Sequence, residues 1–158
     1  MMKTIALAVA LLAAAPAMAQ TNINLGGIRA DSSAAVEIAA DNLSVDQNTG
    51  TAVFSGNVII GQGDLRLSAG SVRVVYSDAT GDIAELKATG GVTFATATEA
   101  AEAQAADYNL TTGTLTLTGD VLLTQGASAL TAQRMTVNVD TGVAQMSGRV
   151  RTVFQQGN

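Results

Sequence analysis

The chain contains four copies of one pattern, and this repeat constrains its fold more than any other feature. Each copy has an alternating apolar strand, a turn that ends in Thr-Gly, a second strand, and then Gly-x-Val or a near variant. The turn glycines Gly50, Gly81, Gly113 and Gly142 are separated by 31, 32 and 29 residues. A repeat of this length is one supersecondary unit that is copied and stacked, because each copy is too small to bury its own apolar face.

The first 19 residues have the pattern of a cleaved secretory signal peptide. Lys3 gives a positive start, residues 5–15 are apolar, and Ala17-Met18-Ala19 fits the small-x-small rule, so we expect cleavage before Gln20. The apolar run is too short to cross a bilayer as a helix. We therefore divide the chain into a signal peptide (1–19), a flexible N-terminal arm (20–34) and a single β-domain (35–156).

The composition of the exported part excludes several classes of protein. Seven Lys and Arg remain against thirteen Asp and Glu, which gives a net charge of −6. We therefore expect no binding to nucleic acid through phosphate neutralisation, and no electrostatic binding to an anionic membrane surface. Cysteine is absent, so stability must come from burial and strand pairing without disulfides.

Short segments of alternating apolar and polar residues predict β-strands with one buried and one solvated face. The clearest segments are residues 43–45, 72–76, 115–117 and 135–139. Each Thr-Gly turn fits a three-residue hairpin loop with its glycine in the left-handed region, so we expect a positive φ at all four turn glycines. Strands joined by short hairpins, without a helical period, predict an all-β antiparallel sandwich, roll or solenoid.

One Ala-rich segment has a local preference that conflicts with the repeat. Residues 95–106 favour a helix by propensity alone. In the register of the repeat, however, this segment falls where the other copies begin a new strand. We expect a strand, because tertiary context overrides propensity.

The residue types that most catalytic sites require are missing or scattered. The chain has no His and no Cys, which excludes Ser-His-Asp and Cys-His sites and leaves only carboxylates as metal ligands. The carboxylates are dispersed singly, without the spacing of a calcium loop. Asp140-Thr141-Gly142 matches the triplet of aspartic proteases, but the equivalent turn position holds Asn48, Ala79 or Thr111 in the other copies. We therefore expect no enzyme activity, no metal site and no cofactor.

Small side chains dominate the predicted interior, since the strands are rich in Ala, Val, Leu and Ile. The five aromatic residues are Phe54, Tyr76, Phe94, Tyr108 and Phe154. Packing in a core is the simpler interpretation of these rings. The alternative is that some of them line an apolar groove. A roll with small inward side chains leaves its interior partly open, and such an interior accepts an extended apolar ligand.

Several motifs recur with the spacing of the repeat. Residues 38–46 are followed by Phe54-Ser55-Gly56-Asn57-Val58-Ile59-Ile60 and by Gly61-Gln62-Gly63. A later copy has residues 106–110, then Leu117-Thr118-Gly119-Asp120-Val121 and Gln125-Gly126. These motifs resemble the OstA-like periplasmic lipopolysaccharide-transport protein A (LptA) family, and the similarity extends from Ala35 to Phe154. Domains of the inner-membrane and outer-membrane partners share the fold, but a cleaved signal without a membrane helix or barrel domain favours the free periplasmic member.

The resemblance implies a fold, a ligand and partners. Members of the family fold as an open, twisted antiparallel β-jellyroll that is V-shaped in section. They are periplasmic, bind lipopolysaccharide through the acyl chains of lipid A, and pass it from the inner to the outer membrane. The implied partners are an LptC-like inner-membrane component at the N-terminal edge, an LptD-like outer-membrane barrel component at the C-terminal edge, and further copies of the chain in head-to-tail association.

Alternation places the apolar strand residues on shared faces, and we expect those faces to converge on the lipid path, with Ile38 near one mouth. The net negative charge also favours binding through the acyl chains, because a phosphate-binding site requires Arg and Lys. A dozen buried methylene groups supply roughly 10 kcal/mol. The candidate lipid-binding residues are Ile38, Leu43, Val45, Val74, Tyr76, Val92, Phe94, Tyr108, Leu110, Leu115, Leu117, Met135, Val137 and Val139.

The two ends of such a roll are also candidate binding sites. A roll built of hairpins without closure leaves its first and last strands unpaired, and natural proteins usually protect such edges with Pro, Lys or bulges. Residues 35–40 contain one charged residue, Glu37, and no Pro or Lys, while residues 143–154 contain Arg149 and Arg151. We therefore expect strand addition by a partner at both edges.

A different class of function fits the same repeat and composition. The alternative is a secreted structural β-solenoid or adhesin-like repeat protein without a lipid ligand. A solenoid of this kind has a filled core, so bound lipopolysaccharide distinguishes the two functions.

Overall fold

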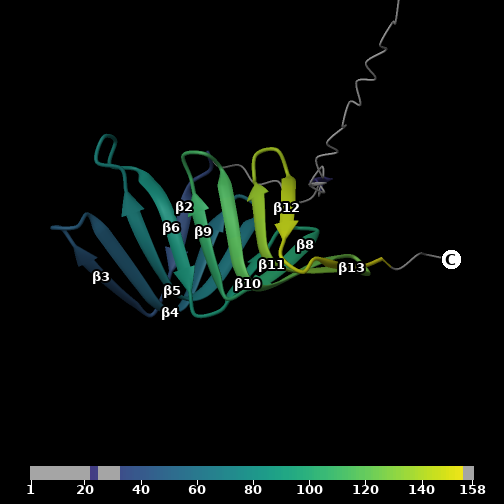
Figure 1. Ribbon diagram of the computed structural model, residues 1–158. Helices are drawn as coiled ribbons and strands as arrows, with labels where there is room; N and C mark the ends of the chain where they lie inside the picture. Colours follow the sequence, from purple (N-terminus) through teal and green to yellow (C-terminus); the bar gives the residue numbers. More distant parts are fainter. Residues whose placement is uncertain (1–21, 25–32, 155–158) are drawn as a thin grey trace, which may run out of the picture.

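The computed structural model describes residues 22–24 and 33–154, and all regular structure in these residues is β-strand (Figure 1). The expected signal peptide lies outside the described residues, as do residues 20–21 and 25–32 of the expected arm. Within the described part of the chain, no helix is long and apolar enough to cross a membrane.

The described residues form one sheet of thirteen strands, in which every pair is antiparallel. The fold is therefore all-β and antiparallel as predicted, and the Ala-rich segment 95–106 forms strands rather than a helix. Four strands are long: β4 (Thr51–Gln62), β5 (Leu65–Tyr76), β10 (Thr114–Gln125) and β11 (Ser128–Asn138). The others are β1 (Asn22–Asn24), β2 (Val36–Ala39), β3 (Asn42–Asp46), β6 (Ile83–Thr89), β7 (Val92–Ala95), β8 (Glu99–Ala103), β9 (Ala105–Asn109), β12 (Val143–Ser147) and β13 (Arg151–Val153).

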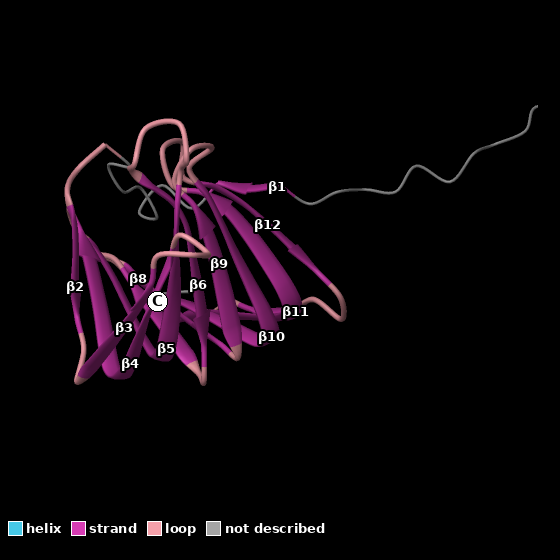
Figure 2. Cartoon of the chain, turned by 90° about the vertical axis from the view of Figure 1, so that its left-hand side faces the viewer, coloured by secondary structure: helices cyan, strands magenta, loops and turns pink. Residues whose placement is uncertain are grey.

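Each long strand changes partners halfway along, and this folds the sheet into two layers (Figure 2). The first half of β4 pairs with β3 and its second half pairs with β2. The first half of β10 likewise pairs with β9 and its second half with β8. Layer A contains β3, β6, β9, β12 and β1 with the adjoining halves of the long strands. Layer B contains β2, β7, β8 and β13 with the other halves.

The chain turns from layer A into layer B at four corners, and each corner is a Gly followed by a second residue that also has a positive φ. Val follows each of these pairs, so the corners are the Gly-x-Val elements of the repeat. Two of them coincide with register shifts in β4 and β10, as expected for a bulge that bends a strand. The φ values are 80° and 47° at Gly56-Asn57, 82° and 82° at Gly90-Gly91, 82° and 47° at Gly119-Asp120, and 78° and 51° at Gly148-Arg149.

The returning chain passes so close to the corners that it leaves no room for a side chain on the glycine. The Asp41 N–H donates to the Gly56 carbonyl oxygen at 2.9 Å, and the Gln104 N–H donates to the Gly119 carbonyl oxygen at 3.0 Å. A Cβ on Gly56 would lie 2.7 Å from Asp41 Oδ2, and a Cβ on Gly119 would lie 2.5 Å from Gln104 Oε1. Glycine is therefore required at these corners both by the positive φ and by the close approach.

The four turns at the outer rim of layer A end in the glycines that the sequence singled out. Their φ values are +63° at Gly50, +75° at Gly81, +68° at Gly113 and +74° at Gly142, so the predicted positive φ is confirmed. The predicted loop length is wrong, because the β3–β4, β9–β10 and β11–β12 turns contain four residues between the paired strand ends rather than three.

The last residue of the preceding strand explains why the longer loop is stable. Asp46 Oδ1 accepts the Asn48 N–H at 2.9 Å. Asn138 Oδ1 accepts the N–H groups of Asp140 and Thr141 at 3.0 and 3.1 Å. Each side chain thus pairs N–H groups inside the turn, as Asx turns do. Asp140 of the Asp-Thr-Gly triplet is accordingly an exposed turn residue.

Residues Asn22–Asn24 differ from the expected flexible arm, since they form β1 on the free side of β12. The expectation of an irregular arm over 20–34 is therefore wrong for these three residues. A strand of three residues is too short to show a period in the sequence, and its pairing partner lies at the other end of the chain.

The inward rows of the two layers pack against each other and form a continuous core. The largest fully buried side chains come from both layers, and they include Phe94, Ile60, Leu65, Leu115 and Met135. Glu99 and Gln62 are the buried polar residues in the described part of the chain. The middle of the roll is therefore packed.

Replacement of Gly119 by Ala should lower the free energy of unfolding more than replacement of Gly91. The two glycines have the same φ, but only Gly119 has a close neighbour where the Cβ would lie. Gly119 and Gly91 both have φ +82°, but a Cβ meets Gln104 at Gly119 and nothing within 4 Å at Gly91. Gly119→Ala should therefore cost about 1–3 kcal/mol more than Gly91→Ala. Urea unfolding of both variants measures the difference, and equal losses would contradict the close-approach argument.

Candidate functional site

The candidate lipid-binding residues lie on or beside the inward rows of the two layers. In layer A the row runs from strand to strand, because Leu43 pairs with Phe54, Phe54 with Val72 and Val72 with Ala88. In layer B, Ile38 pairs with the buried Ile60. The structure therefore brings the predicted residues together on one side of the folded sheet.

These residues differ widely in exposure. Ile38 and Leu110 are half-buried against the core, whereas Leu43, Val45 and Tyr76 are 56%, 62% and 40% exposed. A ligand therefore has access to only part of the row without movement of the layers. The buried members are Val74, Val92, Phe94, Tyr108, Leu115, Leu117, Met135, Val137 and Val139.

The roll is open at the end formed by β2 and β3, which we call the N-terminal end. Among the described strands, β3 pairs only with β4, so no strand covers the far side of Leu43 and Val45. Phe54 lies beside Leu43 and is only half-buried. This end presents an apolar surface that continues directly into the packed interior.

A second opening lies between the rims of the two layers. It is a cavity of about 640 Å³. Val36 and Gln62 line it from layer B, while Ile83 and Leu110 line it from layer A. Apolar and polar groups are mixed in its lining, so it is less apolar than the N-terminal end.

A buried hydrogen bond joins the two layers beside this cavity. Tyr108 Oη in layer A donates to Gln62 Oε1 in layer B at 2.7 Å, and both side chains are at most 2% exposed. Gln62 Nε2 also donates to the Ala34 carbonyl oxygen at 3.1 Å. In an apolar interior a satisfied polar pair of this kind holds its two layers in one arrangement.

Gln62 did not appear among the predicted site residues, although the sequence contains a signal for it. Gln62-Gly63 and Gln125-Gly126 occupy equivalent places in the repeat. Gln125 Nε2 donates to Glu99 Oε1 at 3.1 Å, and the Thr98 hydroxyl donates to Glu99 Oε2 at 2.6 Å. The Gln of each Gln-Gly element thus forms hydrogen bonds at the rim of layer B. In the sequence, the signal for this role is a polar residue that recurs at an inward position of the repeat.

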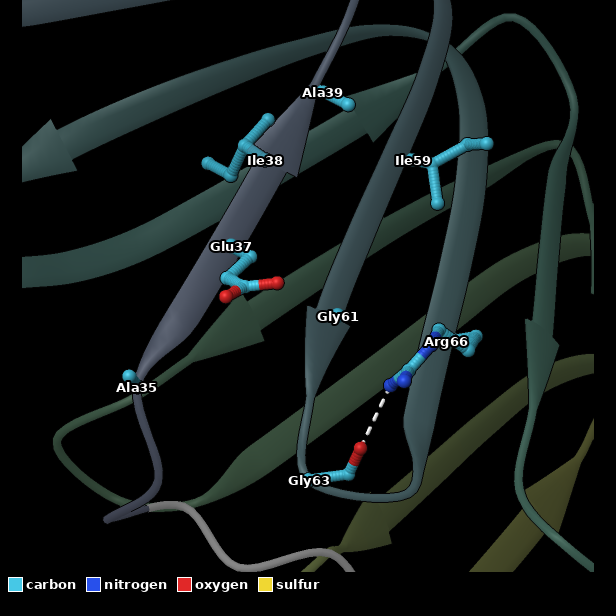
Figure 3. A pocket seen from close by; sticks show the side chains of 8 residues that line it. All are labelled: Ala35, Glu37, Ile38, Ala39, Ile59, Gly61, Gly63 and Arg66. Atoms are coloured by element: carbon cyan, nitrogen blue, oxygen red, sulfur yellow. Dashed lines mark hydrogen bonds between the residues drawn. The ribbon is translucent and has the colours of Figure 1, made fainter.

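The outer face also has a hollow beside the β2 edge, and Ile38 is among the residues that line it (Figure 3). Glu37, Gly61 and Arg66 face one another across three strands, and the missing side chain at Gly61 leaves a cavity of about 490 Å³. Arg66 Nη1 donates to the carbonyl oxygens of Gly63 and Leu65 at 2.7 and 2.8 Å. The guanidinium group is thus held against the β4–β5 turn.

A charged cluster also lies on the outer face of layer A. Lys87 Nζ is 3.8 Å from Glu85 and 3.9 Å from Asp107. A hydrogen bond shared with Asp107 raises the pKa of the Glu85 carboxyl above its ordinary value, and partial burial raises it further. In the described part of the chain no group of three or more side chains is placed to hold a metal ion.

Comparison with known proteins agrees with this architecture. The described strands form a two-layer antiparallel roll with an apolar interior and an apolar surface at its N-terminal end. The family model of the LptA/(LptD N-terminal domain) LPS transport protein matches residues 37–143. The chain therefore belongs to this family.

A solved structure has the same fold. The crystal structure of LptH, the LptA-homologous periplasmic component of the lipopolysaccharide transport device of Pseudomonas aeruginosa, is similar to the chain with a TM-score of 0.72 and 16% identity. The similarity covers 80% of this chain and 99% of that one. No curated protein sequence gives a significant match.

Tyr108→Phe should destabilise the protein, because it leaves the buried Gln62 without the hydroxyl that bonds it across the layers. We expect a loss of about 1–3 kcal/mol in the free energy of unfolding. The chain offers a matched control, since Tyr76 is the other tyrosine and is 40% exposed. Tyr76→Phe should have little effect in the same denaturant titration, and an equal loss for both variants would contradict the role of the hydrogen bond.

Glu85→Gln should stabilise the protein near neutral pH and not in acid. The pKa of Glu85 is raised in the folded state, so the folded protein binds more protons than the unfolded chain between the two pKa values. The free energy of unfolding therefore falls as pH rises through that window. Thermal melts should show a higher Tm for the variant at neutral pH and no gain well below the ordinary pKa of Glu. A gain that is independent of pH would contradict this assignment.

Proposed function

We propose that this protein is a periplasmic carrier that binds lipopolysaccharide through the acyl chains of lipid A and passes it from the inner to the outer membrane. The observation that supports the proposal most is the inward row of apolar residues, which is exposed at the N-terminal end and continues through the whole roll. Membership of an LPS transport family supports the ligand class. The periplasmic location follows the relative LptH and the signal-peptide pattern.

The distribution of charge supports binding of the acyl chains rather than of the phosphates. Every Lys and Arg among the described residues is exposed, and none lies in an inward row. The inward rows offer aliphatic contacts, and each buried methylene group contributes about 0.8 kcal/mol. The sugars and phosphates of the ligand therefore remain outside the roll while the acyl chains lie between the layers.

Passage of acyl chains through the packed middle requires the two layers to separate. The corners form one line along which the layers can pivot, and the contacts between the layers are mainly apolar. When the layers separate, the entering acyl chains take the place of the apolar contacts between the layers. The apolar surface that the separation exposes is therefore buried again. The hydrogen bond between Tyr108 and Gln62 joins the two layers, so it must break.

Photo-crosslinking tests the lipid path directly. A photoreactive amino acid at the inward positions Leu43, Val45 or Leu110 should capture lipopolysaccharide in the cell. The matched outward positions Thr93 and Thr116 should capture none, because alternation turns them away from the interior. Equal capture from both faces would contradict the path, and no capture anywhere would favour the structural repeat protein without a lipid ligand, which the packed core also permits.

The two ends of the roll support head-to-tail association and docking to membrane components. At the end formed by β12 and β13, which we call the C-terminal end, Val150, Val153 and Phe154 are 48%, 50% and 70% exposed. Apolar side chains are therefore exposed at both ends, although at the C-terminal end β1 covers the β12 edge of layer A. We propose that an inner-membrane LptC-like component docks at the N-terminal end, and that an outer-membrane LptD-like component or another copy docks at the C-terminal end.

Charge also favours this arrangement. The exposed Arg149 and Arg151 lie at the C-terminal end, while Glu37 and Asp46 lie at the N-terminal end. In layer B, β13 runs away from the corners and β2 runs toward them, so a stacked second copy continues the antiparallel sheet. Opposite charges at the two ends steer them together.

Exchange of charge tests head-to-tail association. Glu37→Arg alone and Arg151→Glu alone should each weaken concentration-dependent association in sedimentation velocity by placing like charges at the junction. A mixture of the two variants should associate better than either alone, because the altered ends are again complementary. A protein that stays monomeric at every concentration, or variants that behave as the wild type, would contradict the proposed junction.

A further inference from the structure

The last strand of layer A has its free side occupied by the first strand of the chain. β1 pairs with β12 in an antiparallel register, with Asn22 opposite Gln145, Ile23 opposite Ala144 and Asn24 opposite Val143. The two strands lie side by side at the edge of the sheet (Figure 2). The edge that a second copy needs for docking is thus covered by a segment from the opposite end of the sequence.

The direction of β1 is the direction that an incoming strand would have. Layer A begins with β3 and ends with β12, and neighbouring strands in it are antiparallel. In a head-to-tail stack, β3 of the second copy would lie beside β12 and run antiparallel to it. β1 is also antiparallel to β12, so it has the polarity of that incoming β3.

The sequence of β1 matches β3 in its pattern as well. Both strands begin with Asn, an apolar residue and a second polar residue, Asn22-Ile23-Asn24 and Asn42-Leu43-Ser44. The central residue of β1 stands at the register position of Ala144, which is fully buried in the inward row. Leu43 is the inward residue at the same place in β3. β1 therefore occupies this edge with the strand direction that β3 of another copy would have, and with a similar sequence.

We propose that β1 is an intramolecular cap that mimics β3 of a second copy, and that head-to-tail association requires its displacement. The inference rests on the proposed docking at the C-terminal end. β1 has three residues, whereas β3 has five and brings the exposed Leu43 and Val45. The incoming strand buries more apolar surface and makes a longer ladder, so it displaces the cap when its concentration is high enough.

A disulfide that locks the cap provides the test. The chain has no cysteine, and Gln145 is exposed, so Asn22→Cys combined with Gln145→Cys introduces one pair at opposed positions of antiparallel strands. Directly opposed residues have Cα atoms about 4.5–5.5 Å apart, which suits a disulfide. The oxidised protein should stay monomeric in sedimentation velocity at concentrations where the wild type associates. Reduction should restore association, and each single cysteine variant, kept reduced, should behave as the wild type.

The converse variant removes the cap. Ile23→Pro disrupts the three-residue ladder and leaves β12 intact, so association should occur at a several-fold lower protein concentration than in the wild type. The inference is overturned if no intramolecular disulfide forms in dilute protein, if the oxidised protein associates as the wild type does, or if Ile23→Pro leaves the association constant unchanged. If neither the wild type nor Ile23→Pro associates at any concentration, the proposed docking itself fails, and the cap fails with it.

Discussion

The close approach of two chain segments at the corners is the constraint on which the rest of the structure depends. Corner glycines such as Gly56 and Gly119 combine a positive φ with a neighbour so near that a Cβ cannot be placed. Because the corners recur with the repeat, they fall on one line and fold a single sheet into two layers. The alternating strand residues on the inner side of that fold then have only one another to pack against, which produces a continuous apolar interior.

This geometry accounts for both parts of the proposed function. An interior built from two layers that pivot on one line can admit an elongated apolar molecule without unfolding either layer. A sheet that does not close on itself also has two ends, and apolar side chains such as Leu43 and Phe154 are exposed there. The buried pair of Tyr108 and Gln62 holds the layers together across this interior, and the strand β1 covers one edge. The roll is therefore held together as a single molecule, while apolar side chains at its ends remain exposed.

Local patterns in the sequence were sufficient to predict most of the fold. The turn glycines predicted the positive φ, and alternation predicted the inward position of residues such as Leu43 and Leu117. The repeat also identified strands in the Ala-rich segment, where propensity favours a helix. In each case the information lies within a few residues of the feature.

The features that sequence reasoning missed depend on contacts between distant segments. The bond from Tyr108 to Gln62 joins residues 46 positions apart, and the pairing of β1 with β12 joins the two ends of the described chain. The length of the turns depended on side chains such as Asn138, whose bonds to the backbone are visible only in three dimensions. The exposure of Leu43 and the burial of Leu117 likewise follow from the place of each strand in the sheet, since both have the same pattern in the sequence.

The central claim is that the interior holds the acyl chains of lipid A. Native mass spectrometry of the purified protein with three matched ligands tests it most directly: intact lipopolysaccharide, the same molecule with its acyl chains removed, and the same molecule with its phosphates removed. The account predicts complexes with the intact and dephosphorylated molecules, and none with the deacylated one. Binding of the deacylated molecule as strong as that of the intact one would contradict it.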